Sequence, residues 1–401
     1  MRRRLLPILS VLIVGILFLT YACGDDVQKA EPDHLRKITP LGTIAALPLE
    51  VLHPGNNPVS KEKVELGRLL FYDPVLSGNN DVSCASCHHP EFGYAENIEL
   101  SIGVSGQGLG YERFFRRPEA IPFTKRNSQS LLNIGFNGIN PDGEYDPLKA
   151  PMFWDLRATS LEEQSLHPIR QFEEMRGTDF DEPVIIEQVL SRLRAIPGYQ
   201  KRFAQVFGPD SAITETNLAK AIACFERTLV ANQSKFDQYM RGETSALTIS
   251  EKEGMDLFVK VGCARCHNGP MLSDFKVHVI AAPESDKRKD IDSGFNNSFA
   301  FRTPTLRNLR FTAPYMHSGK IASLEDVLTF YEDLRGKPLR TKNIQPHQLD
   351  TLVQQVKLEF KDISRILEFL NALNDRNYDK TIPPSVPSGL PVGGDIVLTK
   401  K

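Results

Sequence analysis

Cys84-Ala85-Ser86-Cys87-His88 is the stretch that decides the fold of this chain. Two cysteines followed directly by histidine are the attachment signature of a c-type haem. The same pattern returns as CARCH at residues 263–267. A zinc site or a pair of redox dithiols is the competing interpretation, but neither needs a histidine directly after each cysteine pair. We therefore expect two covalently bound haem c groups.

Each motif supplies a covalent attachment and one axial ligand. The cysteines would form thioethers with the haem vinyl groups, and the histidine would ligate the iron from the proximal side. Four of the six cysteines are used in this way. The expected cofactor-binding residues are Cys84, Cys87 and His88 for the first haem and Cys263, Cys266 and His267 for the second.

The composition is that of an ordinary globular protein. The chain has 401 residues, of which 41% are apolar and 24% charged, and this length is enough for two or three domains. Lysine and arginine total 48 against 50 for aspartate and glutamate. Because no strong basic field results, we expect no nucleic-acid partner.

The first residues predict export to the periplasm. Arg2-Arg3-Arg4 precedes an apolar run at residues 5–19, which is typical of a secretory signal and short for a membrane span. We expect a signal peptide at residues 1–22. Residues 19–23 resemble a lipobox, so Cys23 is expected to carry a lipid anchor, with residues 23–48 as a tether. Ordinary cleavage after Ala22 is the alternative.

Apolar spacing predicts a mainly α fold built from two tandem cytochrome-c-like haem domains with long irregular loops. We expect an N-terminal haem domain at residues 49–240, a C-terminal haem domain at residues 241–378 and a tail at residues 379–401. Cys224 lies on an apolar helical stripe and is expected to be a buried thiol. The predicted helices span residues 60–71, 184–193, 214–231, 248 into the second haem motif, 323–334, 349–360 and 363–373.

Several further stretches resemble those of the bacterial di-haem cytochrome c peroxidases and their relative MauG, across about residues 50–378. The order in which these stretches follow one another along the chain is not one that chance would produce. These stretches are Arg126-Asn127, FWDLRA at residues 153–158, LEEQ at residues 161–164, Glu174-Met175, PTLRN at residues 304–308 and TAPYMH at residues 312–317.

The resemblance implies a peroxide-cleaving pocket at the N-terminal haem, formed by Gln164, Pro168 and Glu174. Cleavage of the O–O bond needs a group that takes a proton from one oxygen and returns it to the other, which the carboxylate of Glu174 can do. Gln164 would orient the peroxide, and Pro168 would shape the pocket without adding a donor. The alternative is that these acidic residues form solvated helix faces.

The resemblance also implies residues between the two haems. Trp154, the only tryptophan, matches a residue that carries a hole from one iron to the other, although a lone tryptophan is more often a core residue. Asn127 through its side chain, and Thr312 and Pro314 through backbone carbonyls, match calcium ligands of the family.

One departure from the peroxidases concerns the N-terminal haem. In those enzymes the resting haem has a second histidine ligand, which belongs to a Ser-Ile-Gly-His stretch. This histidine must leave the iron before peroxide can bind. Here residues 101–103 are followed by Val104, which cannot ligate iron. We expect the sixth position to be open or to hold water, so that no reductive activation is needed. His89 or His167 as a replacement ligand is the competing idea.

A second departure concerns the C-terminal haem. Where the peroxidases have a methionine ligand, counting along the matching helix leads to Tyr331, and MauG has tyrosine there too. An insertion at residues 140–150 also resembles MauG. The alternative is that Tyr331 is a core aromatic and that Met316 or His317 ligates the iron.

These features predict an exported di-haem peroxidase that reduces hydrogen peroxide with electrons from a periplasmic donor such as a small cytochrome c. The second option is a MauG-like enzyme that oxidises residues of a partner protein. A non-catalytic electron carrier would fill both axial positions and would have no use for Glu174 or Gln164. The sequence leaves the oligomeric state open, with a dimer among the possibilities.

Overall fold

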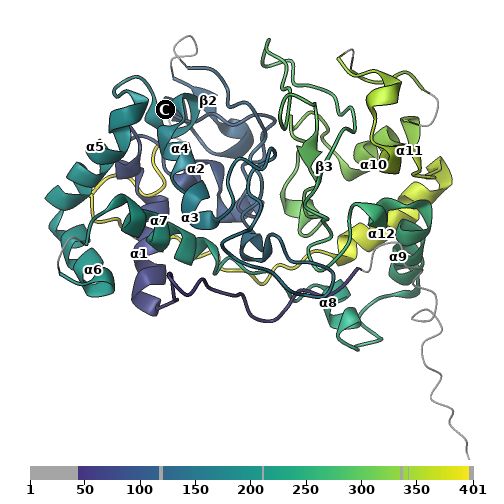
Figure 1. Cartoon of the computed structure of the whole chain (residues 1–401), viewed down its shortest axis with the longest axis horizontal. Coiled ribbons are helices and arrows are strands. Elements are labelled where there is room, and N and C mark those ends of the chain that lie inside the picture. Colours follow the sequence, from purple (N-terminus) through teal and green to yellow (C-terminus); the bar gives the residue numbers. More distant parts are fainter. Residues whose placement is uncertain (1–43, 117–120, 210–211, 335–336, 342, 397–401) are drawn as a thin grey trace, which may run out of the picture. The chain divides into compact units, whose positions relative to one another are not determined.

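The computed structural model describes residues 44–116, 121–209, 212–334, 337–341 and 343–396. Helices dominate and the strands form short antiparallel pairs, β1 with β2 and β3 with β4 (Figure 1), which confirms the mainly α expectation. The strands are β1 (Gly106–Gln107), β2 (Phe114–Phe115), β3 (Val277–His278) and β4 (Phe301–Arg302). The helices are α1 (Lys61–Tyr72), α2 (Cys84–Cys87), α3 (Leu161–Gln164), α4 (His167–Arg170), α5 (Glu182–Ala195), α6 (Pro197–Phe207), α7 (Glu215–Glu226), α8 (Lys235–Met240), α9 (Ile249–Val261), α10 (Leu324–Asp333), α11 (Thr351–Gln354) and α12 (Ile363–Ala372).

The helix before each haem motif begins at a side-chain cap. Ser60 caps α1 by accepting a hydrogen bond from the Lys63 backbone N–H, which satisfies one of the free donors at the helix start. Thr248 and Glu251 cap α9 reciprocally, as the sequence predicts. The two haem motifs therefore follow helices with fixed starting points.

Each of these two helices packs against a later helix through a glycine. A Cβ on Gly67 of α1 would lie 2.0 Å from the carbonyl oxygen of Ala221 in α7, and one on Gly254 of α9 would lie 2.1 Å from that of Arg365 in α12. Both glycines open the same Gly-x-x-Leu-Phe pattern. Because a side chain at either position would force the helices apart, the pattern gives both haem motifs the same close-packed support.

Two separate hydrophobic clusters surround the supporting helices. The first joins α1, α5, α6 and α7, with Leu70 and Ile222 completely buried. The second joins α9 and α12, where Phe258 packs against Phe369 with ring centroids 5.3 Å apart. Cys224 is also completely buried, which confirms the prediction of an inert core thiol.

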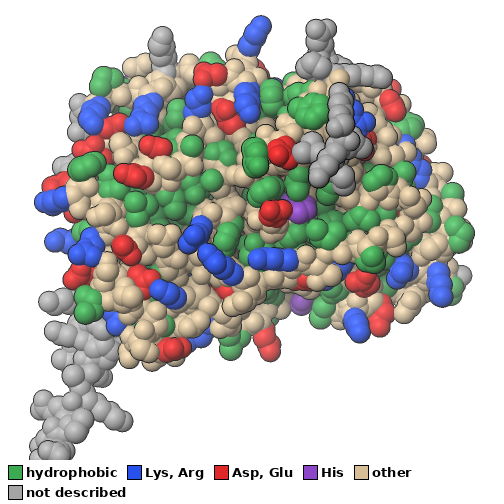
Figure 2. Space-filling view, turned by 180° about the vertical axis from the view of Figure 1, so that it is seen from behind, with side chains coloured by type: hydrophobic (Ala, Val, Ile, Leu, Met, Phe, Trp, Pro, Cys, Tyr) green, Lys and Arg blue, Asp and Glu red, His purple; other side chains and the backbone are tan. Residues whose placement is uncertain are grey.

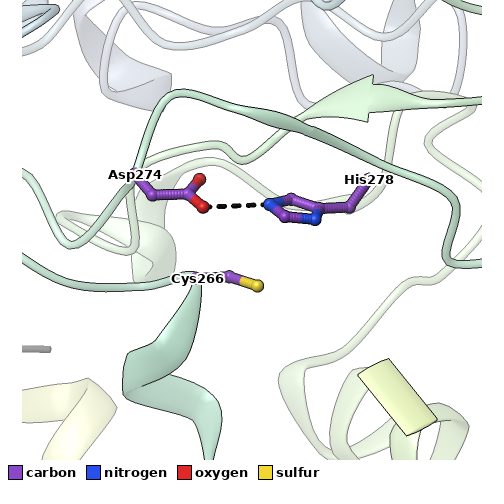
Figure 3. A group of neighbouring side chains, drawn as sticks. All are labelled: Cys266, Asp274 and His278. Carbon is purple, nitrogen blue, oxygen red and sulfur yellow. Dashed lines mark hydrogen bonds and ion pairs between the residues drawn. The ribbon is translucent and has the colours of Figure 1, made fainter. Parts of the chain in front are cut away.

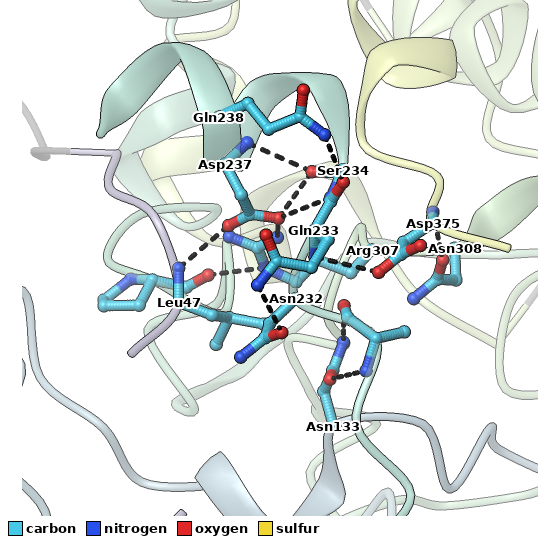
Figure 4. Close-up of polar contacts among 12 residues, drawn as sticks. Leu47, Asn133, Asn232, Gln233, Ser234, Asp237, Gln238, Arg307, Asn308 and Asp375 are labelled. Atoms are coloured by element: carbon cyan, nitrogen blue, oxygen red, sulfur yellow. Dashed lines mark hydrogen bonds and ion pairs between the residues drawn. The ribbon is translucent and has the colours of Figure 1, made fainter. Parts of the chain in front are cut away.

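A network of polar side chains connects the segment before α8 to distant parts of the chain (Figure 4). Asp237 accepts hydrogen bonds from the Leu47 backbone N–H and from the Arg307 guanidinium, at 2.9 and 2.8 Å. Asp375 accepts one from the Gln233 backbone N–H at 2.8 Å and donates its own N–H to Asn308 at 2.8 Å. Because Asp237, Arg307 and Asp375 are buried and paired, they fix the course of the chain between the two clusters.

The stretch after α12 leaves the second cluster and returns to the first (Figure 1). We call residues 379–396 the C-terminal strap. Within it, Ser388 donates a hydrogen bond to Asp73 at 2.6 Å, and Gly393 donates its N–H to Tyr72 at 2.7 Å. The Gly393 carbonyl accepts a hydrogen bond from Ser86, which lies between the two cysteines of the first haem motif. The strap has no helix, yet hydrogen bonds hold it along its length.

Two helix predictions need correction, and one helix was missed. The helix predicted at residues 214–231 ends at Glu226, after which Thr228 and Leu229 make turn hydrogen bonds. The helix predicted at residues 349–360 is only the single turn α11, because Gln355 closes it and irregular backbone follows. Helix α6 was not predicted, because its Pro-Gly start reads as a turn, although proline is well suited to the first turn of a helix.

The predicted signal peptide, the lipid anchor at Cys23 and most of the tether lie outside the described residues. In the part of the chain that the structure describes, no helix combines the length and the apolar character needed to span a membrane. Figure 2 shows basic and acidic side chains interspersed over one face. This mixture agrees with the near-zero net charge of the chain.

Candidate haem and peroxide site

One cavity of about 560 Å³ contains both haem motifs in its lining. Cys84, Cys87 and His88 line one part, and Cys263, Cys266 and His267 line another. The four cysteines make no disulfide with any described residue. They are therefore available for thioether formation, and the cavity has the size of a cofactor pocket.

The two proximal histidines have equivalent surroundings. The Nδ1 atom of His88 lies 2.9 Å from the Tyr94 carbonyl oxygen, and that of His267 lies 3.0 Å from the Leu272 carbonyl oxygen. A carbonyl can only accept, so Nδ1 carries the hydrogen in both rings and Nε2 keeps its lone pair for iron. Burial lowers the pKa of His88 to about 4 and also lowers the pKa of His267. Both rings are neutral at pH 7, as a haem ligand must be.

Gln164, Pro168 and Glu174 line the same cavity as the first haem motif. The structure thus brings together the three residues that the resemblance implies. Gln164 ends α3, and its buried Oε1 atom has no hydrogen-bond partner among the described residues. Because an orphaned amide oxygen is costly in a finished core, this atom fits a site completed by a small hydrogen-bonding ligand.

Glu174 sits in a π-helical turn, Phe172–Arg176, rather than on a regular helix. Burial raises the pKa of its carboxyl group to about 7, while Arg157 lowers it and Glu173 raises it. A carboxyl group with this pKa can both accept and release a proton near neutral pH. Glu162, by contrast, is bound by the Arg227 guanidinium at 2.6 and 2.7 Å and belongs to the supporting structure.

Val104 does not line the cavity. Its side chain belongs to the first hydrophobic cluster, and its backbone N–H donates to the Glu174 carbonyl at 2.9 Å. His89 and His167 are absent from the cavity lining as well. The structure therefore places neither the valine nor the two alternative histidines in the lining of the cavity.

Trp154 contacts Asn127, one of the three expected calcium ligands. The Trp154 indole nitrogen donates to the Asn127 carbonyl oxygen at 3.1 Å. The Asn127 side-chain amide donates to the Ile98 and Glu99 carbonyls at 3.0 and 3.2 Å, which leaves its oxygen for a cation. Asn127, Thr312 and Pro314 all line the cavity. Three oxygens from this set fit calcium, which accepts hard oxygen ligands and water.

Tyr331 lies on α10 and lines the cavity near the second haem motif. Its hydroxyl group makes no hydrogen bond to another described residue, and burial raises its pKa. The two motif cysteines, Cys263 and Cys266, add to this effect. Met316 and His317 line the same cavity. His317 stacks on Phe301 with ring centroids 3.7 Å apart and has Nε2 3.3 Å from Glu284, so its ring already has partners.

Arg302 is a site residue that sequence reasoning missed. Its buried guanidinium donates to the Phe153 carbonyl at 2.8 Å and to Gln129 at 3.1 Å, but it meets no carboxylate among the described residues. Burial lowers its pKa to about 10. A buried cation needs an anionic partner, and the propionate groups of a haem would supply one. The signal available in the sequence was that Arg302 stands just before the PTLRN stretch of residues 304–308.

Glu226 was also missed. It ends α7, lines the cavity and has a buried oxygen without a hydrogen-bond partner among the described residues. Burial raises its pKa to about 8, against the opposing effect of Arg227. Its neighbours on the apolar stripe gave no sign that a carboxyl group would be enclosed here.

Cys266, Asp274 and His278 come together beside the second haem motif (Figure 3). His278 lies between two carboxylates, with Nε2 2.9 Å from Asp274 and Nδ1 2.8 Å from Asp350. Burial would lower the pKa of His278, but its hydrogen bonds to these carboxylates raise it. Because Cys266 is the thioether residue of the haem motif, the group is better explained as support for the haem than as a separate metal site.

Comparison with known proteins supports this arrangement. The family model described as di-haem cytochrome c peroxidase matches residues 61–245. The methylamine utilization protein MauG of Methylorubrum extorquens is 32% identical over 336 residues, covering 81% of this chain and 82% of that protein. The cytochrome c551 peroxidase of Nitrosomonas europaea is 32% identical over 340 residues, covering 82% of this chain and 85% of that protein.

A solved structure extends the similarity to three dimensions. The crystal structure of a MauG-like protein associated with microbial copper homeostasis matches with a TM-score of 0.65 and 28% identity, covering 82% of this chain and 95% of that chain. The family has two haem c groups, in agreement with the two equivalent motifs in the cavity. This chain belongs to the family of di-haem cytochrome c peroxidases and MauG.

Proposed function

We propose that this protein is a di-haem peroxidase that reduces hydrogen peroxide to water with electrons from a small periplasmic redox protein such as a cytochrome c. The observation that carries the proposal is the placement of Glu174 and Gln164 in the cavity of the first haem motif. An electron carrier needs neither a proton-transfer group nor an open ligand position. The relatives named cytochrome c551 peroxidase support the same reaction class.

The residues of the pocket account for the proton transfers. One peroxide, two electrons and two protons give two waters, so the site must move protons as well as electrons. A haem bound at His88 supplies the redox chemistry. Glu174 takes a proton from one peroxide oxygen and delivers it to the other, which leaves as water. Gln164 orients the peroxide through its free amide oxygen, and Pro168 closes the pocket without competing for a hydrogen bond.

Trp154, the second haem motif and a calcium ion would complete the electron path. His267 and His88 would each hold a haem that supplies electron-transfer chemistry, and Trp154, which lines the same cavity, would provide the path for electrons from the second site to the first. Asn127, Thr312 and Pro314 hold calcium, and Asn127 connects that ion to the tryptophan through its carbonyl group. Residues 49–240 form the peroxidatic domain and residues 241–378 the electron-transfer domain, with export to the periplasm and lipid attachment at Cys23.

A MauG-like reaction on a partner protein is the second candidate. It is favoured by Tyr331, which presents a free hydroxyl group to the cavity beside the second haem motif. A phenolate ligand favours oxidised haem over reduced haem, whereas a thioether ligand favours reduced haem. An enzyme with Tyr331 as ligand is therefore suited to keeping an oxidising equivalent and passing it to a protein side chain.

The test is steady-state peroxide consumption by the purified, haem-loaded protein, with a reduced small cytochrome c as donor. Peroxidase function predicts one peroxide consumed for every two cytochromes oxidised. Consumption that needs no added donor and instead modifies a partner protein would favour the MauG-like candidate. No reaction with peroxide at all would reject both.

A further inference from the structure

The turn that carries Glu174 is too short to hold itself in place. It consists of residues Phe172–Arg176, closed by hydrogen bonds from the Met175 and Arg176 N–H groups to the Gln171 carbonyl. The carboxyl group of Glu174 has no hydrogen bond among the contacts of the described residues. The orientation of the Glu174 carboxyl group therefore depends on the contacts that hold the backbone of the turn.

A first loop contacts the turn at Glu174. Besides the hydrogen bond from the Val104 N–H, Gly103 touches the turn so closely that a Cβ there would lie 2.2 Å from the Glu173 and Glu174 carbonyl oxygens. This loop is held by Arg113, whose side chain is completely buried. The Arg113 guanidinium donates to the carbonyls of Ile102, Gly103 and Gly108 at 2.5, 3.0 and 2.8 Å.

A second loop contacts the turn at its other end. The Gly78 N–H donates to the Met175 carbonyl at 2.8 Å, and a Cβ on Gly78 would lie 1.9 Å from the Arg176 carbonyl oxygen. This loop is held by Arg192 of α5. Its guanidinium donates to the carbonyls of Val75, Ser77 and Gly78 at 3.3, 2.6 and 2.8 Å, and to the Asn80 side chain at 2.8 Å.

The two loops have the same construction. In each, one arginine binds three backbone carbonyls, and a glycine of that loop presses against the turn. Charge-assisted hydrogen bonds from one guanidinium to three backbone carbonyls stiffen such a loop. A displacement of about 1 Å in a catalytic group can cost about 100-fold in rate, so stiffness here has a direct consequence for proton transfer.

We propose that Arg113 and Arg192 are positioning residues for Glu174, each acting through the loop that it binds. The inference rests on the proposed role of Glu174 in peroxide cleavage. It adds a second role for the loop that carries Val104 in place of the displaceable histidine, because the backbone N–H at position 104 anchors the proton-transfer turn. In this proposal, the loop with Gly103 and Val104 supplies no sixth ligand for the haem and also positions the carboxyl group of Glu174.

A double-mutant cycle on the haem-loaded, full-length enzyme tests the proposal. Arg113→Met and Arg192→Met are each made in the wild-type and Glu174→Gln backgrounds, and the second-order rate constant for reaction with peroxide is measured by stopped flow. We expect each arginine variant to lower the rate constant by about 10- to 100-fold in the wild type. We expect a change of less than about twofold in Glu174→Gln, because groups that act as one unit are not additive.

Arg194→Met is the matched control. Arg194 lies on the same helix and its guanidinium also donates to a carbonyl, that of Ile213, but it does not hold either loop. Its rate constant should equal that of the wild type. Gly103→Ala leaves both arginines intact and tests the contact itself, so it serves where an arginine variant fails to fold. It should lower the rate constant in the wild type and not in Glu174→Gln.

The outcomes separate the two proposals. Equal losses in both backgrounds, or a Gly103→Ala variant with the full rate constant, would overturn the positioning role and leave the acid–base role of Glu174 standing. A Glu174→Gln variant with the full rate constant would remove the acid–base role, and the positioning role with it.

Discussion

The indole nitrogen of Trp154 donates a hydrogen bond to the backbone carbonyl of Asn127, the same residue whose side-chain oxygen is left free for calcium. One residue thus contacts both the expected electron bridge and the expected cation. Binding of the ion would hold the Asn127 backbone, and through it the tryptophan, in one position. Calcium and electron transfer are therefore expected to be coupled.

Removal of calcium should slow electron transfer between the haems. Asn127→Ala keeps the carbonyl that binds Trp154 but loses the side-chain ligand, so calcium affinity should fall by about 10-fold or more. Isothermal titration calorimetry would measure this affinity, and stopped-flow oxidation of the reduced second haem after peroxide is added would follow the transfer. Wild-type affinity in the variant would show that the ion, if bound, lies elsewhere.

Two haems should remain attached after denaturation, because thioether bonds are covalent. Mass spectrometry of the denatured protein should show the chain plus two haems. In Cys263→Ala or Cys266→Ala the second haem keeps a single thioether, and its absorption band should shift accordingly. A mass corresponding to one haem in the unmutated chain would contradict the assignment of the second motif.

The fully oxidised enzyme should react with peroxide without prior reduction. Val104 lies in the hydrophobic cluster, and neither His89 nor His167 lines the cavity. Electron paramagnetic resonance of the resting enzyme should therefore show one high-spin ferric haem. Only low-spin signals, with activity appearing after partial reduction, would mean that another residue fills the sixth position.

Glu174→Gln should slow O–O cleavage by about 10²- to 10⁴-fold while peroxide still binds. Burial raises the pKa of Glu174 to about 7, with Arg157 and Glu173 as its charged neighbours. Because the ionised form accepts the proton, the rate of the wild type should rise as pH increases through about 7 and then level off. The variant should lose this rise, as stopped-flow measurements across the pH range would show.

Tyr331 should set the potential of the C-terminal haem. Free tyrosine has a pKa of about 10, so coordination must supply the free energy for loss of the proton at neutral pH. Tyr331→Met should raise the potential of this haem and make the protein resemble the methionine-ligated peroxidases. Redox titration decides the matter: unchanged potentials in Tyr331→Phe would assign the ligand to another residue, with Met316 the better placed alternative.

Much of the fold could be predicted because its signals are local. The caps at Ser60 and Thr248 and the two haem motifs depend on neighbouring residues, and the structure agrees with each. The helix predicted at residues 349–360 failed because apolar spacing alone does not distinguish a helix from buried irregular backbone. Helix α6 was missed because proline followed by glycine indicates both a turn and a helix start.

The residues of the site also divide into those that could be predicted from the sequence and those that could not. Gln164, Pro168 and Glu174 could be named from a resemblance in sequence, and the structure brings them to one cavity. Arg302 and Glu226 could not, because an arginine or a glutamate in a sequence says nothing about whether it will be buried without a partner. That property depends on contacts between residues far apart in the chain, such as Arg302 with Phe153.

The C-terminal strap has a consequence for how the protein is made. Ser86, between Cys84 and Cys87, is bound by Gly393 near the opposite end of the chain. This contact restrains the segment that attachment machinery must reach to act on both cysteines. The first haem should therefore be installed on an open, immature chain, with closure of the strap as the last step of biogenesis. A chain whose last residues dock early would be expected to leave export with one haem missing.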